Sequence, residues 1–142
     1  MSTSSAEAVW DGGTNGKGHF RAASGAFRAD YSVPTRFEGK PGTNPEELIA
    51  AAHASCFAMA FSGAAAKAGG TPKSVDVTAD VDFGPDNERG GFMITKIHLT
   101  VRADVEGLDE AAFQEVAEGA KAGCPVSKAL AGVDISLDAA LA

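Results

Sequence analysis

Two stretches of the chain alternate between apolar and polar residues, which is the pattern of a β-strand with one buried and one solvent-facing side. They cover residues 75–83 and 97–105. Between them stand Gly-Pro at 84–85 and Gly-Gly at 90–91, and such pairs favour turns. The two strands are therefore predicted to form a hairpin.

The N-terminal third of the chain predicts smaller elements. A short strand is expected to end at Trp10, before a glycine-rich turn at residues 12–16. Residues 19–32 predict a hairpin with its turn at 24–25. Residues 33–44 are rich in glycine, proline and polar side chains, and they predict a loop.

A long helix is predicted from Pro45 to Ala68. Asn44 can cap its first N–H groups, acidic residues at 46–47 suit the positive end of its dipole, and glycines at 69–70 end it. Its apolar character extends all the way round, which predicts a buried core helix rather than a membrane span. Because 142 residues are few to surround so long a helix, we expect a dimer whose partner helps to cover it.

The C-terminal part predicts two more helices and one strand. Asp109 can cap a helix that ends at Gly123, and Cys124 followed by proline opens a short third helix. Alternation across residues 133–137 predicts the final strand. With no internal repeat, the expected fold class is α+β, with mostly antiparallel strands in a single domain covering residues 1–142.

Composition and charge narrow the class of protein. Hydrophobic residues make up 44% of the chain and charged residues 22%, which is ordinary globular usage. The net charge of -7 repels phosphate backbones, so no nucleic acid partner is expected. The start shows no basic and apolar leader, and two cysteines are too few for a secreted disulfide scaffold. We therefore expect a cytoplasmic protein with no membrane partner.

The two cysteines carry the strongest chemical signal. Cys124 precedes a proline at the predicted start of a helix, where free N–H groups and the helix dipole favour a thiolate. Cys56 lies in the middle of the long helix among small apolar residues. Burial there raises the pKa of a thiol, so Cys56 needs a nearby cation to react. Two buried structural cysteines are the alternative.

Arg36, in the predicted loop, is the expected source of that cation, and a solvated loop arginine is the alternative. Glu46 stands ten residues before Cys56, which is about 15 Å along a helix axis. The two side chains should therefore not touch within one chain. Glu46 is either a charge at the helix start or a partner of a group brought to it, such as Arg36 of either protomer.

His53 stands three residues before Cys56 on the same helix face. A Cys–His couple suits a cysteine hydrolase or a metal site. No local motif supplies an orienting carboxylate or an oxyanion hole, however, and His19 and His98 lack ligand spacing. We expect a structural His53, with tuning of Cys56 and a catalytic or ligand role as the alternatives.

Three segments together form a specific combination of sequence motifs. They read TRFEG at residues 35–39, GTNPEELIAAAHASCF at residues 42–57 and AGCPVS at residues 122–127. These motifs resemble those of the OsmC/Ohr family of thiol peroxidases, which reduce organic hydroperoxides. The likeness begins near Trp10 and reaches the C-terminus, and it is closer to the osmotically inducible OsmC branch than to the Ohr branch.

The resemblance implies roles for four residues. Cys56 matches the peroxidatic cysteine and Cys124 the resolving cysteine. Arg36 and Glu46 match the pair that positions and activates the peroxidatic thiolate, with Glu46 reaching across a dimer interface. The implied fold is an intertwined α+β homodimer, with a long central buried helix and mostly antiparallel sheets wrapped around it.

The implied activity is that of an antioxidant oxidoreductase in a stress response. Cys56 reduces an organic hydroperoxide to an alcohol, becomes a sulfenic acid and forms a redox-active disulfide with Cys124. An external dithiol of the lipoyl type reopens the disulfide, without a bound cofactor or metal. The alternatives are a non-catalytic redox sensor, an apolar-ligand binder, and a hydrolase that uses Cys56 with His53.

Overall fold

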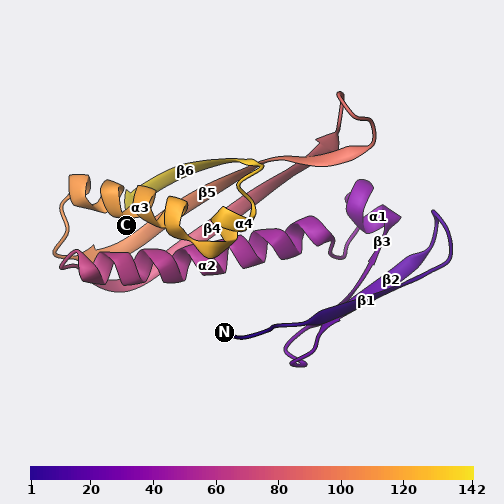
Figure 1. Ribbon diagram of the computed structural model, residues 1–142, viewed down its shortest axis with the longest axis horizontal. Helices are drawn as coiled ribbons and strands as arrows, with labels where there is room; N and C mark the ends of the chain where they lie inside the picture. The colour runs from indigo at the N-terminus through magenta and orange to yellow at the C-terminus, as the bar shows by residue number, and fades with distance from the viewer. The chain divides into compact units, whose positions relative to one another are not determined.

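The computed structural model describes residues 1–142 and divides them into two compact units, Met1–Glu47 and Leu48–Ala142 (Figure 1). Each unit contains one three-stranded sheet. Helices accompany both sheets, so the predicted α+β class is confirmed. The expectation that residues 1–142 act as a single domain stays a prediction.

The first unit is an antiparallel sheet in which the strands follow one another in chain order. The strands are β1 (Ala6–Asp11), β2 (Lys17–Ala22) and β3 (Arg28–Ser32). The short strand at Trp10 and the following hairpin are thus present as predicted. Tyr31 joins the strands through its ring, whose centroid lies 5.4 Å from that of Trp10 and 5.5 Å from that of Phe20. This aromatic packing gives the small sheet an apolar face.

A short helix, α1 (Val33–Phe37), follows β3 and corrects the prediction of a loop over residues 33–44. Ser32 and Thr35 form a reciprocal cap. The Ser32 hydroxyl accepts from the Thr35 backbone N–H at 3.3 Å, and the Thr35 hydroxyl accepts from the Ser32 N–H at 2.9 Å. A proline in the first turn also favours the start of this helix. Arg36 therefore lies in the last turn of a helix rather than in a loop.

The predicted long helix is α2 (Pro45–Lys67). Asn44 begins it as predicted, because its side-chain oxygen accepts the Glu47 backbone N–H at 2.8 Å. The Glu47 carboxylate accepts the Thr43 hydroxyl at 2.8 Å. The helix start is thus fixed by side chains on both sides of its first turn.

The second sheet has its strands in the order β4-β5-β6. Its strands are β4 (Thr71–Pro85), β5 (Phe92–Glu106) and β6 (Asp134–Leu141). β4 and β5 pair antiparallel as the predicted hairpin, whereas β6 runs parallel to β5. Parallel neighbours need a crossover connection. Here the crossover consists of α3 (Glu110–Gly123) and α4 (Pro125–Ala129).

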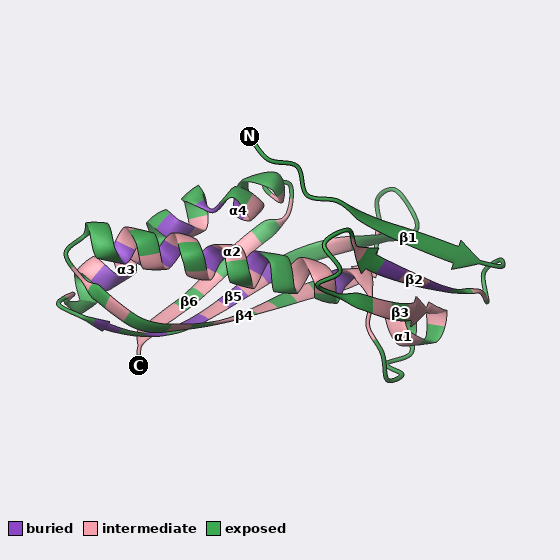
Figure 2. Cartoon of the chain, turned by 90° about the horizontal axis from the view of Figure 1, so that it is seen from below, coloured by how far each residue is buried: buried purple, intermediate pink, exposed green.

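The core of the second unit lies between this sheet and helices α2 and α3. Strand β5 contributes every second residue to this core, and these buried residues are Ile97, Leu99, Val101, Ala103 and Val105. Helix α3 contributes Phe113, whose ring centroid lies 5.3 Å from that of Phe61 on α2. Within the second unit, buried residues recur along α2 at intervals of one turn (Figure 2), and they are His53, Phe57, Phe61 and Ala65.

The opposite face of α2 is exposed in the single chain. Met59 is 78% exposed, and Ala51, Ser55 and Gly63 continue this face. By length and composition alone the helix could cross a membrane, but the core helices of many globular proteins meet the same test. Only 22% of its apolar stretch is buried. The predicted burial on several sides is therefore not reached within one chain.

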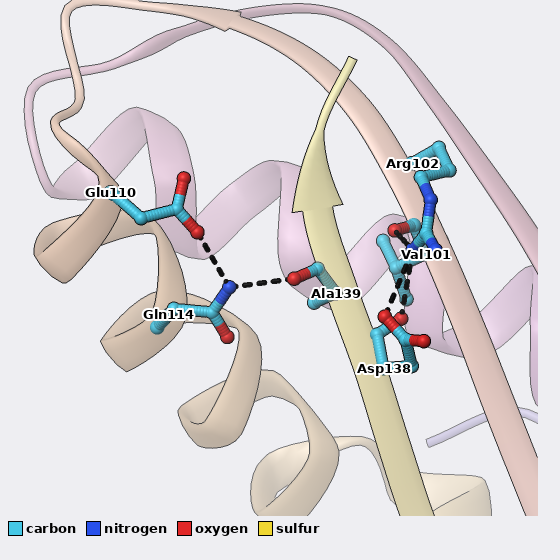
Figure 3. Close-up of polar contacts among 6 residues, drawn as sticks. All are labelled: Val101, Arg102, Glu110, Gln114, Asp138 and Ala139. Carbon is cyan, nitrogen blue, oxygen red and sulfur yellow. Dashed lines mark hydrogen bonds and ion pairs between the residues drawn. The ribbon is translucent and has the colours of Figure 1, made fainter.

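Polar side chains attach β6 to its neighbours (Figure 3). Gln114 on α3 donates to the Ala139 carbonyl at 2.6 Å and to the Glu110 carboxylate at 2.8 Å. On β5, Arg102 donates to the Asp138 carboxylate at 3.2 Å. These bonds hold β6 to α3 on one side and to β5 on the other.

Candidate functional site

Cys56 and Cys124 lie side by side, with their sulfur atoms 3.0 Å apart. Both are free thiols, since a disulfide would bring the sulfurs to about 2.05 Å. Cys56 comes from the middle of α2, and Cys124 is the residue that precedes α4. The fold thus joins two cysteines that are 68 positions apart in the chain.

Cys124 occupies the N-cap position of α4, as predicted from the proline that follows it. Burial acts to raise its pKa, but interactions with Cys56, Ser127 and Val126 outweigh burial and lower the pKa below that of an ordinary thiol. The backbone N–H groups of Val126 and Ser127 stabilise negative charge on the sulfur without meeting the geometry of a full capping hydrogen bond. The helix start therefore favours a thiolate.

The pKa of Cys56 shifts in the opposite direction and is raised above that of an ordinary thiol. Burial is the largest cause that raises its pKa, and the hydrogen bond with Cys124 raises it further. The Val126 backbone N–H acts in the other direction but does not compensate. This agrees with the expectation that Cys56 needs an additional cation to react as a thiolate.

His53 is completely buried and forms a contact with Ser127 on α4, with its Nε2 atom 2.7 Å from the Ser127 Oγ atom. Its Nδ1 atom has no hydrogen-bond partner in the chain. Burial lowers the pKa of His53, so its ring is neutral near pH 7. Because Nε2 faces Ser127, and Cys56 pairs with Cys124, no Cys56–His53 couple is formed.

Arg36 and Glu46 form a two-pronged ion pair within the first unit. The Arg36 Nη2 atom lies 2.6 Å from Glu46 Oε1, and Nε lies 3.1 Å from the same oxygen. Glu46 is buried, and the guanidinium also faces the Phe37 ring at 5.6 Å. Such forked pairs hold a guanidinium in one orientation. The sequence left two alternatives for Glu46, a charge at the helix start or a partner of Arg36. In this structure Glu46 is a partner of Arg36 of its own chain.

A cavity of about 460 Å³ opens beside Arg36 in the first unit. Its walls include three large side chains, Trp10, Tyr31 and Phe37, together with Val33. Arg36 is the charged residue among them. The cavity can therefore hold an apolar group next to a cation. Elsewhere in the chain, no group of three or more His, Cys, Asp or Glu side chains is placed to hold a metal ion.

Ser127 is the residue of this region that sequence reasoning did not single out. It stands three positions after Cys124, and it is buried, with 4% of its surface exposed. A serine three positions after a helix cap does carry a weak signal, because it lies in the first turn where it can turn back toward the cap. Its contact with His53, 74 positions away, could only be found in the structure.

The geometry defines a class: an α+β protein with a reduced cysteine pair, one thiol on a central helix and one at a helix start. The chain belongs to the family of OsmC-like proteins, whose family model matches residues 37–138. That match covers three of the four predicted site residues, Glu46, Cys56 and Cys124, and Arg36 stands one position before it.

Known relatives resemble nearly the whole chain. Peroxiredoxin OsmC of Escherichia coli K12 is 48% identical over 93% of this chain and 92% of its own length. Organic hydroperoxide resistance protein OhrB of Bacillus subtilis is 35% identical over 85% of this chain and 88% of its own. The crystal structure of OhrB superimposes with a TM-score of 0.77, covering 96% of this chain and 98% of OhrB. The predicted likeness to the OsmC branch is thus confirmed.

Mild oxidation of the folded protein with a thiol-specific oxidant should form the Cys56–Cys124 disulfide within one chain. The sulfurs start 3.0 Å apart and need to approach by only about 1 Å. Intact mass should fall by two hydrogens, and thiol labelling after denaturation should find no free cysteine. Cys56→Ser and Cys124→Ser each keep one labelled thiol. Disulfides formed only between chains would contradict the geometry.

Proposed function

We propose that this protein is a thiol peroxidase that reduces organic hydroperoxides to alcohols through Cys56 and Cys124. The observation that carries the proposal is the pair of free thiols 3.0 Å apart on separate elements. Its likeness to a peroxiredoxin and to an organic hydroperoxide resistance protein agrees with this chemistry. The activity classes the protein as an antioxidant oxidoreductase.

In the first step the Cys56 thiolate attacks one peroxide oxygen and the O–O bond breaks. The alkoxide leaves with a proton as the alcohol, and Cys56 becomes a sulfenic acid. Cys56 is the attacking thiol because it is partly open to solvent, whereas Cys124 is fully buried. A substrate can therefore meet Cys56 first.

In the second step Cys124 attacks the Cys56 sulfur. The S–O bond breaks, the S–S bond forms, and one water leaves with the proton that Cys124 gave up. A dithiol then reopens the disulfide by thiol–disulfide exchange and is itself oxidised to a disulfide. We propose a lipoyl-type dithiol for this role, and a cytoplasmic location, where reducing conditions keep such donors available.

Arg36 and Glu46 complete the proposed catalytic set. Cys56 has a raised pKa because of burial, and a guanidinium brought near it would favour the thiolate. Glu46 accepts three hydrogen bonds from Arg36, two from Nε and one from Nη2, which fixes the direction of the guanidinium. In an assembled dimer we assign the pair to Cys56 activation, with Glu46 acting across the interface.

The aromatic cavity beside Arg36 supports organic peroxides as substrates. Its apolar walls favour an alkyl or aryl group over water. Arg36 can meet the polar peroxide end. Hydrogen peroxide has no apolar group to bury, so we expect it to be the poorer substrate.

The exposed face of α2 supports an intertwined homodimer. Met59, at 78% exposure, lies on a face of small residues, and small residues permit close approach of a second helix. A second copy of the chain would supply the cover that the single chain lacks. A sensor that is oxidised once would use the same two thiols, and the first test below separates the two functions.

The first test is steady-state consumption of cumene hydroperoxide with dihydrolipoamide, beside hydrogen peroxide as the comparator. Sustained turnover that favours the organic peroxide is expected, because the cavity beside Arg36 is apolar. Cys56→Ser should reduce the rate to the uncatalysed background. A single stoichiometric oxidation without turnover would instead identify a sensor.

Arg36→Ala should slow the reaction of Cys56 with cumene hydroperoxide by about tenfold at neutral pH, because an adjacent cation lowers a thiol pKa by roughly one unit or more. The measurement is the single-turnover rate constant, together with the pH profile of Cys56 alkylation. Arg28→Ala is the matched control, since Arg28 forms an exposed ion pair with Asp30 in the same unit. An alkylation profile unchanged by Arg36→Ala would remove Arg36 from the mechanism.

Met59→Glu should shift the protein from dimer to monomer, because it places a charge on the face that the partner is proposed to cover. Light scattering should then give a mass near the 14.4 kDa of one chain. Ala111→Glu, at an exposed position of α3, is the control and should leave the dimer intact. A dimer that survives Met59→Glu would place the interface elsewhere.

A further inference from the structure

The glycine-rich turn at residues 12–16 is a sequence feature to which the proposed reaction gives no task. It follows β1, and its backbone binds the aromatic residue near the end of that strand. The carbonyl of Gly13 accepts the indole Nε1–H of Trp10 at 3.0 Å and the backbone N–H of Gly16 at 2.9 Å. The turn therefore holds the indole ring by its polar edge.

A glycine on the neighbouring strand makes room for the same ring. Trp10, Gly18 and Tyr31 stand directly opposite one another on β1, β2 and β3. A Cβ atom at position 18 would lie 2.9 Å from both Trp10 Cε3 and Tyr31 Cε1, which is closer than carbon atoms pack. Because Gly18 has no side chain, the two rings meet over the middle strand, with their centroids 5.4 Å apart.

The turn imposes a similar restriction at Gly16. A Cβ atom there would overlap the Asp11 carbonyl oxygen and lie 2.9 Å from Trp10 Nε1. A larger residue at position 16 would therefore displace either the turn or the indole. The Trp10 ring is thus held by one hydrogen bond, by one ring contact and by two positions that lack a side chain. These contacts leave the ring a single orientation.

Trp10 is nevertheless not a core residue. It is 39% exposed, and it forms one wall of the cavity of about 460 Å³ beside Arg36. Tyr31 is in contact with rings on two sides, Trp10 and Phe20, and so supports the wall. Phe37 faces the Arg36 guanidinium. Trp10 is therefore the wall residue whose ring is fixed by the sheet and the turn and also open to a ligand.

We propose that Trp10 is a specificity-determining residue, and that its indole ring selects hydroperoxides with an aromatic organic group over aliphatic ones of equal carbon number. The inference rests on the proposed peroxidase function and deepens it by naming the class of substrate. Trp10 takes no part in the transfer of oxygen. It acts on the organic group, and Arg36 can meet the peroxide end.

Ring-on-ring contact is the physical reason for this selection. Two aromatic rings that stack or meet edge to face attract each other more strongly than their buried area alone accounts for. An aliphatic group gains only from the removal of apolar surface from water. A wall that is already fixed also loses no rotamer freedom when a ligand binds. The size agrees, since a dry apolar cavity of about 150 Å³ already holds benzene.

The first measurement is binding without reaction, followed by fluorescence. Trp10 is the single tryptophan of the chain, so the signal reports on this cavity. Cys56→Ser is titrated with cumyl alcohol, the product of cumene hydroperoxide, and with dimethylhexylcarbinol, in which a straight hexyl group replaces the phenyl ring. The dissociation constant should be about fivefold lower for cumyl alcohol. A cavity that selects by apolar area alone would prefer the hexyl compound, which has more apolar surface.

The second measurement is the single-turnover rate constant of the protein with both cysteines, at peroxide concentrations below saturation. Trp10→Leu should slow the reaction with cumene hydroperoxide by about fivefold, because the ring contact is lost. It should change the rate with the hexyl counterpart little, since an apolar wall remains. Trp10→Phe keeps a ring and should retain most of the preference for the aromatic peroxide.

Phe27→Leu is the matched control for these variants. Phe27 is an aromatic residue of the same unit, 48% exposed and packed against Phe20, and it does not line the cavity. The preference should therefore survive Phe27→Leu. Thermal unfolding separates loss of fold from loss of the ring contact in each variant.

The two measurements distinguish failure of this inference from failure of the proposed function. The alcohols do not react, so their binding tests Trp10 even if the protein fails to turn over peroxides. Three results would overturn the inference: no saturable fluorescence change with cumyl alcohol, binding of the hexyl alcohol that is equal or tighter, or a Trp10→Leu protein that keeps the aromatic preference. Sustained turnover together with any of these would leave the peroxidase function standing without an aromatic selector.

Discussion

The packing of one side of α2 against the central strand β5 is the interaction on which the position of the cysteine pair depends. Phe57 and Phe61 enter the core beside the alternating residues of β5. The same stripe carries His53 one turn earlier, and Cys56 stands next to Phe57. Because the aromatic anchors fix the rotation of the helix, they also fix the direction in which the thiol and the imidazole point. Core packing and chemistry share one helix face.

Two kinds of control over reactive groups emerge from this arrangement. Arg36 is a charge held in place by a carboxylate, with geometry set by a forked ion pair. Cys124 stands at a helix start, where burial raises the pKa of its thiol and interactions with Cys56, Ser127 and Val126 lower it more than burial raises it. The first suits a group that meets a polar substrate near solvent. The second suits a group that reacts only with its own chain, in a dry core.

Much of this architecture could be predicted from the chain. Caps and glycine stops located α2 and α3, alternation located the long hairpin, and Cys-Pro located the start of α4. Helix α1 was missed, because the reciprocal Ser32–Thr35 cap lies inside a run of loop-forming residues. The His53–Ser127 contact was missed for another reason. It joins residues 74 positions apart, and no local pattern encodes a pairing that exists only after the crossover has folded.

The position of Cys124 within that crossover has a consequence for the oxidised protein. A bond to Cys56 would close a covalent loop over 68 positions, enclosing the β4–β5 hairpin and α3. Closing a loop of this length lowers the entropy of the unfolded chain by the equivalent of about 4 kcal/mol. The form that waits for its reductant is therefore the more resistant to unfolding. Peroxide exposure itself would make the protein harder to degrade.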